Sequence, residues 1–156
     1  MNNETLHIVL KTKDLSIGYK TKKAETVIAD KINIELHKGE FIGLVGANGI
    51  GKSTLLRTLT NVQNSLSGNI YINNKLLSEF QPEDLAKAMS LVLTEQIASK
   101  NLSVFELVAL GRQPYTNWVG NLSDNDITII NRSLQQTNIE ALKHKRCFEL
   151  SDGQLQ

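Results

Sequence analysis

Apolar side chains recur at every second position in four stretches of the chain: residues 6–10, 15–19, 32–36 and 70–72. This period of two is typical of strands with one buried face, and we expect these strands to pair in an antiparallel way. The Asn73-Asn74 pair after the last stretch favours a tight turn, so a short hairpin is predicted there.

Two other stretches are apolar at almost every position and predict strands buried on both faces. They are residues 41–45 and residues 89–93. Strands covered by helices on both faces are typical of parallel sheets, so these two predict the core of an α/β fold. The apolar residues of 55–62 recur at helical spacing and predict a helix that packs back on this sheet.

Two helices in the last third of the chain are predicted to begin with capping boxes. Ser103 precedes Glu106 ahead of an apolar run, and Ser123 precedes Asp126 in the same way. In this arrangement the hydroxyl and the carboxylate each satisfy a backbone N–H group at the start of a helix. The loop between the helices, residues 112–118, holds the single tryptophan of the chain. It is either ordinary packing or a docking surface for another protein.

Composition and charge are those of an ordinary globular domain. Of the 156 residues, 40% are hydrophobic and 21% are charged, which allows one domain with a core. The net charge of +1 gives no electrostatic case for nucleic acid as a partner, so phosphate binding must come from local geometry. The lone Cys147 excludes an internal disulfide framework and is expected to be buried and inert. The first residues lack a secretory signal, which favours a cytosolic location.

The segment between the apolar stretch 41–45 and the following helix fits the phosphate-binding pattern G-x-x-x-x-G-K-[ST]. It consists of Gly46, Ala47, Asn48, Gly49, Ile50, Gly51, Lys52, Ser53 and Thr54. Glycines let backbone N–H groups point inward around phosphate oxygens, where a side chain would block the approach. The pattern places Lys52 to reach the terminal phosphates and Ser53 to ligate Mg²⁺. The helix that follows favours a polyanion at its N-terminus.

A second motif, Leu150-Ser151-Asp152-Gly153-Gln154, lies at the far end of the chain. The two motifs in this order make the chain resemble the nucleotide-binding subunit of an ATP-binding cassette (ABC) transporter, whose signature is a close variant of L-S-G-G-Q. The resemblance implies that the signature, Ser151 to Gln154, acts in trans, with the Ser and Gly contacting the ATP held by the opposite subunit. Asp152 in place of a glycine resembles the importers for iron-siderophore complexes, haem and cobalamin.

The resemblance implies roles for residues outside the two motifs as well. In the family an aromatic residue at the end of an early strand stacks on adenine, and Tyr19 occupies that place. A glutamine at the end of the strand before the helical insert contacts Mg²⁺ and the attacking water. Here Thr94 stands at that place and Gln96 follows two residues later, so one or the other takes the role.

The fold implied is α/β, a P-loop NTPase of the ABC ATPase type. It would contain an antiparallel β subdomain (1–40 and 66–80), a P-loop core with a partial parallel sheet (41–65 and 81–95), a helical subdomain (96–150) and the signature (150–156). In the family an Asp-Glu pair and a histidine that complete the hydrolytic site come later than the signature. We therefore expect an N-terminal fragment that lacks the C-terminal part of the domain, is inactive in hydrolysis and, by itself, is marginally folded or aggregation-prone.

The function implied for the intact subunit is ATP hydrolysis that drives import of an iron-siderophore, haem or cobalamin type substrate. Its expected cofactors are ATP and Mg²⁺, and its expected partners are integral-membrane permease subunits, a second copy in a head-to-tail dimer and, indirectly, a substrate-binding protein. The subunit would be cytoplasmic and peripheral on the inner face of the cell membrane. One alternative is a truncated ATP-binding module without turnover. Another is an ABC ATPase of DNA repair or translation, which the net charge does not favour.

Overall fold

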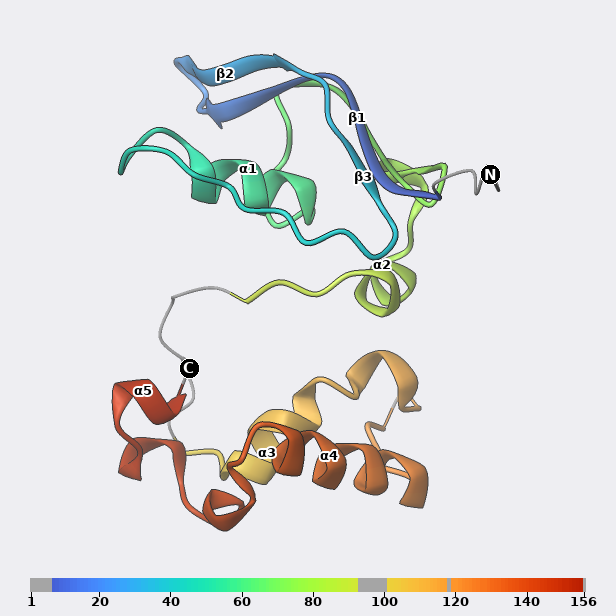
Figure 1. Ribbon diagram of the computed structural model, residues 1–156, viewed down its shortest axis with the longest axis vertical. Helices are drawn as coiled ribbons and strands as arrows, with labels where there is room; N and C mark the ends of the chain where they lie inside the picture. Colours follow the sequence, from blue (N-terminus) through green and yellow to red (C-terminus); the bar gives the residue numbers. More distant parts are fainter. Residues whose placement is uncertain (1–6, 93–100, 118, 156) are drawn as a thin grey trace, which may run out of the picture. The chain divides into compact units, whose positions relative to one another are not determined.

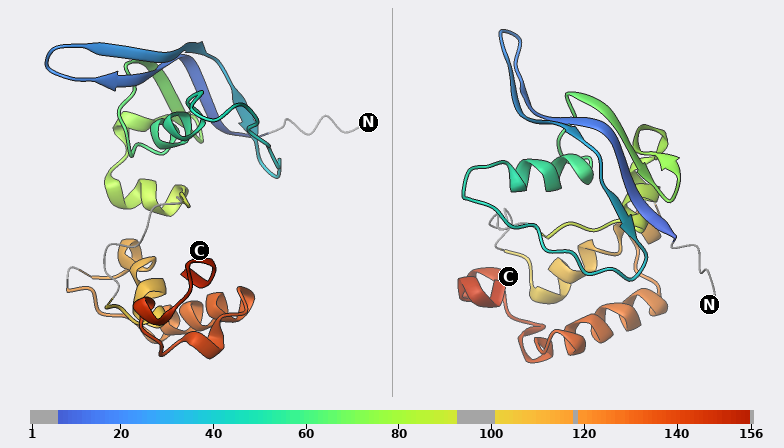
Figure 2. Two further views of the ribbon diagram at one scale, coloured as in Figure 1. Left: turned by 90° about the vertical axis from the view of Figure 1, so that its left-hand side faces the viewer. Right: turned by 45° about the horizontal axis from the view of Figure 1, so that its top comes forward.

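The computed structural model describes residues 7–92, 101–117 and 119–155. Its chain divides into two compact units, one that ends at Leu91 and one that begins at Val92. The first unit contains a β-sheet with helices, and the second is helical, as Figures 1 and 2 show. Each unit is described by itself below.

A five-stranded antiparallel sheet forms the framework of the first unit within the described residues. Its longest strand, β1 (Ile8–Lys20), pairs with three others: β2 (Glu25–Ile32), β3 (Glu35–His37) and β4 (Ser67–Ile72). The hairpin partner of β4 is β5 (Lys75–Leu76). Asn73 and Asn74 both have positive φ, 49° and 66°, which confirms the predicted tight turn.

The predicted strand over residues 32–36 is divided between β2 and β3. The Thr12 hydroxyl of β1 lies at the break, where it donates to the Ile32 carbonyl at 2.8 Å and accepts from the Ile34 N–H at 3.0 Å. Thr12 is only 2% exposed, and Lys31 beside the break has φ of 52°. A side-chain oxygen therefore replaces ladder bonds at this point, which lets both strands stay paired with β1.

Helix α1 (Lys52–Leu59) lies against one face of the sheet, and α2 (Pro82–Ala88) follows the short 3₁₀ turn η1 (Leu77–Glu79). The inward-facing residues of the strands, of α1 and of η1 form one apolar core. It consists of Leu10, Leu15, Ile17, Leu59, Ile70, Ile72 and Leu77. The predicted helical face at 55–62 is confirmed in part, because the helix ends at Leu59 and Val62 is 60% exposed.

The two predicted buried strands are wrong for this structure. Residues 41–45 have no strand structure, with Phe41 fully exposed and Val45 93% exposed. Residues 89–92 also form no strand, and Leu93 lies outside the described residues. The partial parallel sheet is thus missing from the described residues, whose strand pairs are all antiparallel. An apolar segment becomes a strand only where neighbouring backbone completes its hydrogen bonds, and no described strand pairs with either of these two segments.

The second unit is built on α3 (Val104–Leu110) and α4 (Asp124–Gln136). Both predicted capping boxes are confirmed: Ser103 with Glu106, and Ser123 with Asp126. Shorter turns complete the unit: η2 (Gln113–Tyr115), η3 (Glu140–Leu142), η4 (Cys147–Glu149) and α5 (Asp152–Leu155).

The core of the second unit lies between α3 and α4. Val104, Ile130 and Leu134 are its buried residues, and Cys147 of η4 is fully buried as predicted. None of the helices within the described residues combines the length and apolarity needed to cross a membrane.

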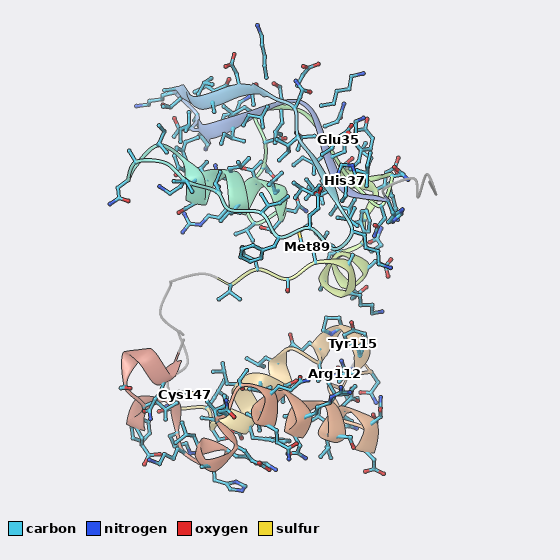
Figure 3. The ribbon with its side chains drawn as sticks, in the orientation of Figure 1. Glu35, His37, Met89, Arg112, Tyr115 and Cys147 are labelled. Carbon is cyan, nitrogen blue, oxygen red and sulfur yellow. The ribbon has the colours of Figure 1, made fainter. Side chains whose placement is uncertain are left out.

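A buried ion pair holds the turn after α3 onto the start of α4. The Arg112 Nε donates to the Asp126 carboxylate at 2.8 Å, and the two side chains are 16% and 6% exposed. The Arg112 guanidinium also lies over the ring of Tyr115, 4.0 Å from its centroid (Figure 3). The carboxylate that caps α4 therefore also anchors the loop between the helices.

Candidate functional site

The predicted phosphate loop, Gly46 to Thr54, lies in the first unit, where it follows residues 41–45 and its last three residues begin α1. Gly49 has φ of 81° and Gly51 has φ of 107°, so both occupy the region that residues with a Cβ rarely adopt. Gly51 is the N-cap of α1, and the N–H of Leu55 returns to its carbonyl oxygen at 2.9 Å. The chain therefore turns directly from the loop into the helix, as the sequence pattern predicts.

Gly51 also lies directly against strand β2. A Cβ added there would overlap the Cγ2 of Ile28, while a Cβ on Gly49 would have open space around it. The loop is consequently seated on the sheet at Gly51 and open at Gly49. Both the backbone angle and the surroundings require a glycine at position 51, whereas at position 49 only the backbone angle does.

The Lys52 side chain bends back over the loop. Its Nζ donates to the carbonyl oxygens of Gly46 and Ala47, at 2.6 and 2.7 Å. These neutral carbonyl oxygens hold the ammonium group inside the curve of the loop. It can exchange these acceptors for anionic phosphate oxygens, with which charge-assisted hydrogen bonds are stronger.

The fold brings Tyr19 next to the loop, although Tyr19 precedes Lys52 by 33 residues in the sequence. The Tyr19 hydroxyl and the Thr54 hydroxyl are 3.1 Å apart, and the Tyr19 side chain is 49% exposed. Both residues line an open hollow of about 360 Å³ that also contains Asn48, Gly49, Gly51, Lys52 and Ser53. The aromatic ring and the phosphate loop are therefore parts of one site.

Two further residues of this hollow were not predicted from the sequence. Arg57 follows Ser53 by four residues on α1, so helical spacing gave a signal that could have identified it. Ile28 reaches the hollow from β2, and nothing in the local sequence indicates this. Together Lys52 and Arg57 give the hollow two cationic side chains.

The chemistry of the hollow suits a polyphosphate. Lys52 is the first residue of α1, whose leading N–H groups have no partner within the helix, and Arg57 lies in the last turn of the same helix. Ser53 is exposed in the hollow, where its hydroxyl is available to a metal ion. Within the described residues no group of three or more His, Cys, Asp or Glu could hold a metal ion. A Mg²⁺ ion at Ser53 could take further ligands from phosphate oxygens and water.

The predicted signature lies in the second unit, at the start of α5. The Ser151 N–H donates to the Gln154 side-chain oxygen at 3.1 Å, and the Gln154 N–H donates to the Ser151 carbonyl at 2.9 Å. This is half of a capping box, with Ser151 at the N-cap and Gln154 at the third helical position. Ser151, Gly153 and Gln154 are exposed. Thr94 and Gln96 lie outside the described residues.

A family model described as "ABC transporter" matches residues 29–156 of the chain, from strand β2 through the loop to the signature. The chain belongs to the ABC transporter family. This confirms the resemblance on which the predicted fold class was based.

Curated relatives of this ABC chain include importer subunits. An ABC transporter ATP-binding protein of Methanocaldococcus jannaschii is 42% identical over 148 residues, covering 95% of this chain and 50% of the relative. The iron(3+)-hydroxamate import ATP-binding protein FhuC of Bacillus subtilis is 36% identical over 147 residues, covering 94% and 53%. The petrobactin import ATP-binding protein FpuD of Bacillus anthracis is 34% identical, covering 94% and 52%. The chain spans about half the length of these relatives.

Solved structures agree with the fold of this ABC chain. The cbiO1 protein of Clostridium perfringens, part of the ABC transporter complex cbiONQ, has a TM-score of 0.71 at 28% identity, covering 95% of this chain and 57% of that protein. A dimeric ATP-binding cassette bound to ADP and Pi has a TM-score of 0.74 at 22% identity, covering 94% and 65%. The second likeness concerns the fold alone.

Proposed function

We propose that this chain forms the ATP-binding part of an ABC importer ATPase. The observation that carries the proposal is the single hollow in which Lys52, Arg57 and the start of α1 lie beside the ring of Tyr19. Cations and helix N–H groups suit the triphosphate, and an exposed aromatic ring suits the base. In this assignment Tyr19 contacts adenine and the loop residues Gly46 to Thr54 surround the phosphates.

The proposed cofactors are ATP and Mg²⁺, with the Ser53 hydroxyl as the protein's ligand to the metal. When bound, Mg²⁺ would supply positive charge to offset that of the phosphates. Lys52 would exchange the Gly46 and Ala47 carbonyls for phosphate oxygens. Thr94 or Gln96 is proposed to contact the metal and the attacking water. The division of the chain into an antiparallel β subdomain, a P-loop core, a helical subdomain and a signature also stays a prediction.

The remaining proposals concern the whole protein. Two copies would close head to tail on two MgATP molecules, with Ser151, Asp152, Gly153 and Gln154 of one copy facing the nucleotide of the other. The closure would act on integral-membrane permease subunits, and a substrate-binding protein would take part indirectly. The subunit would then lie on the cytoplasmic face of the membrane.

The cargo is proposed to be an iron-siderophore, haem or cobalamin type substrate. Support comes from relatives named for iron(3+)-hydroxamate and petrobactin import, and from a further Bacillus subtilis relative named as a probable siderophore transport protein. Asp152 within the signature agrees with this subgroup.

Binding of MgATP to the chain tests the proposal. The Lys52→Ala variant should bind MgATP at least about tenfold more weakly, because a hydrogen bond to a charged group contributes about 1.5–3 kcal/mol. Lys38→Ala, at an exposed lysine of the same unit, is the matched control and should bind like the wild type. Isothermal titration calorimetry measures both constants.

Phosphate release measured on the longer protein separates the two functional alternatives, because the chain by itself is expected to be inactive in hydrolysis. Binding without release supports a nucleotide-binding module without turnover, and release supports an ATPase. If Lys52→Ala binds MgATP as tightly as the wild type, the assignment of the loop is wrong. In the longer protein, transport at a normal rate by Lys52→Ala would overturn the importer proposal.

A further inference from the structure

The end of β1 that carries Tyr19 departs from regular strand geometry. The pairing register with β2 shifts on both sides of Ile17, and at each shift β2 advances by one residue more than β1, so the extra residues lie in β2 opposite Ile17. A Cβ on Gly18 would overlap the Thr26 carbonyl of β2 and come within 2.8 Å of the Leu66 side chain. Extra residues in one strand increase the local twist of a strand pair, and Tyr19 follows this point on β1.

Gln63 holds the backbone of β1 at Gly18. Its side-chain amide donates to the Gly18 carbonyl oxygen, 45 residues away in sequence. The backbone N–H of Gln63 in turn donates to the Arg57 carbonyl at the end of α1, at 3.1 Å. Gln63 therefore connects the strand position beside Tyr19 to the helix that begins at the phosphate loop, although it does not line the hollow itself.

A second contact joins Tyr19 to α1 directly. The Tyr19 hydroxyl lies 3.1 Å from the Thr54 hydroxyl, and Thr54 is only 4% exposed. The ring is thus fixed at its outer end by α1 directly and at its backbone end by α1 through Gln63. With both ends held, the ring has little freedom to turn away from the loop.

We propose that Gln63 is a positioning residue for the ring of Tyr19 and thereby sets the affinity of the site for the base of a nucleotide. This inference rests on the proposed function of the hollow as a nucleotide site. Without the amide, the Gly18 carbonyl loses the Gln63 hydrogen bond and the β1 backbone beside Tyr19 is held less firmly, which lets Tyr19 move. The phosphate contacts, made by the loop and Lys52, stay as they are.

Gln63→Met tests the inference, because methionine has a similar length but donates no hydrogen bond. Two probes are titrated against the full chain with Mg²⁺: ATP, which has a base, and inorganic tripolyphosphate, which has none. ATP should bind about three- to tenfold more weakly, the range expected for one lost hydrogen bond, and tripolyphosphate should bind unchanged. Gln136→Met, at an exposed glutamine of α4, is the matched control.

The ratio of the affinities for ATP and tripolyphosphate is independent of partial unfolding, because unfolding lowers the apparent affinity for both probes equally. The double variant Tyr19→Ala, Gln63→Met should bind ATP no more weakly than Tyr19→Ala alone, since Gln63 acts only through the ring. An unchanged ratio in Gln63→Met, or additive losses in the double variant, overturns the inference. If the wild type binds neither probe, the proposed function itself fails.

Discussion

Replacing Gly51 by alanine should damage the phosphate loop more than the same change at Gly49. Both glycines have positive φ, 107° and 81°, so alanine is strained at either position. The surroundings differ, because a Cβ at Gly51 overlaps the Cγ2 of Ile28 and a Cβ at Gly49 has no atom within 4 Å. The pair therefore separates backbone strain from steric overlap within one loop.

The expected magnitudes follow from these two terms. Backbone strain for a residue with a Cβ in this region costs about 1–2 kcal/mol, and this is the whole loss expected for Gly49→Ala. Overlap with a packed side chain adds about 1–3 kcal/mol, so Gly51→Ala should lose about 2–5 kcal/mol. Adding Ile28→Ala to Gly51→Ala should remove the free-energy cost of the steric overlap and leave the cost of the backbone strain.

Native-state hydrogen exchange of the α1 amides measures this loss locally, since it reports the free energy of opening of that helix. A double-mutant cycle of Gly51→Ala and Ile28→Ala then gives the overlap term as the coupling energy. Gly120→Ala in the second unit has φ of 78° and open space around its Cβ, so it should leave α1 exchange unchanged. Equal losses at Gly49 and Gly51, or a coupling energy near zero, would refute the steric reasoning.

Two predictions concern stability away from the site. Thr12→Val should lower the free energy of unfolding by about 1–3 kcal/mol in urea titrations, because backbone groups between β2 and β3 lose the buried hydroxyl that they bond. Hydrogen bonds from Ser123, with help from Arg112, lower the pKa of Asp126 from 3.8 to about 2. A lowered folded pKa adds stability above the unfolded value, which is lost as pH falls from about 4 to about 2. Asp126→Asn should therefore flatten the acid side of the stability profile measured by urea titration between pH 2 and 5.

Each of these two has an outcome that contradicts it. Thr12→Ser keeps the hydroxyl and should retain most of the stability, so an equal loss in Thr12→Ser and Thr12→Val would show that the hydroxyl bonds do not matter. For Asp126, a variant profile as steep as that of the wild type between pH 4 and 2 would assign the acid sensitivity to other carboxylates.

Several local structures of this protein are determined by interactions between residues that lie within a few positions of one another in the sequence. The two capping boxes, the Asn73-Asn74 turn and the entry from Gly51 into α1 all follow the sequence closely. In each, a hydroxyl, a carboxylate or a glycine acts on backbone three or four residues away at most. Such interactions form the same way in any fold, which is why the phosphate loop could be identified before the structure.

Only the tertiary structure decided how distant segments are joined. The apolar stretch 41–45 predicts a buried strand, yet it is exposed here because strand formation depends on neighbouring backbone that its own residues do not supply. Likewise, nothing near Gln63 or Ile28 indicates that one holds the strand end before Tyr19 and the other meets Gly51. Local sequence specifies the phosphate loop, and packing of α1 on the sheet determines which side chains complete its site.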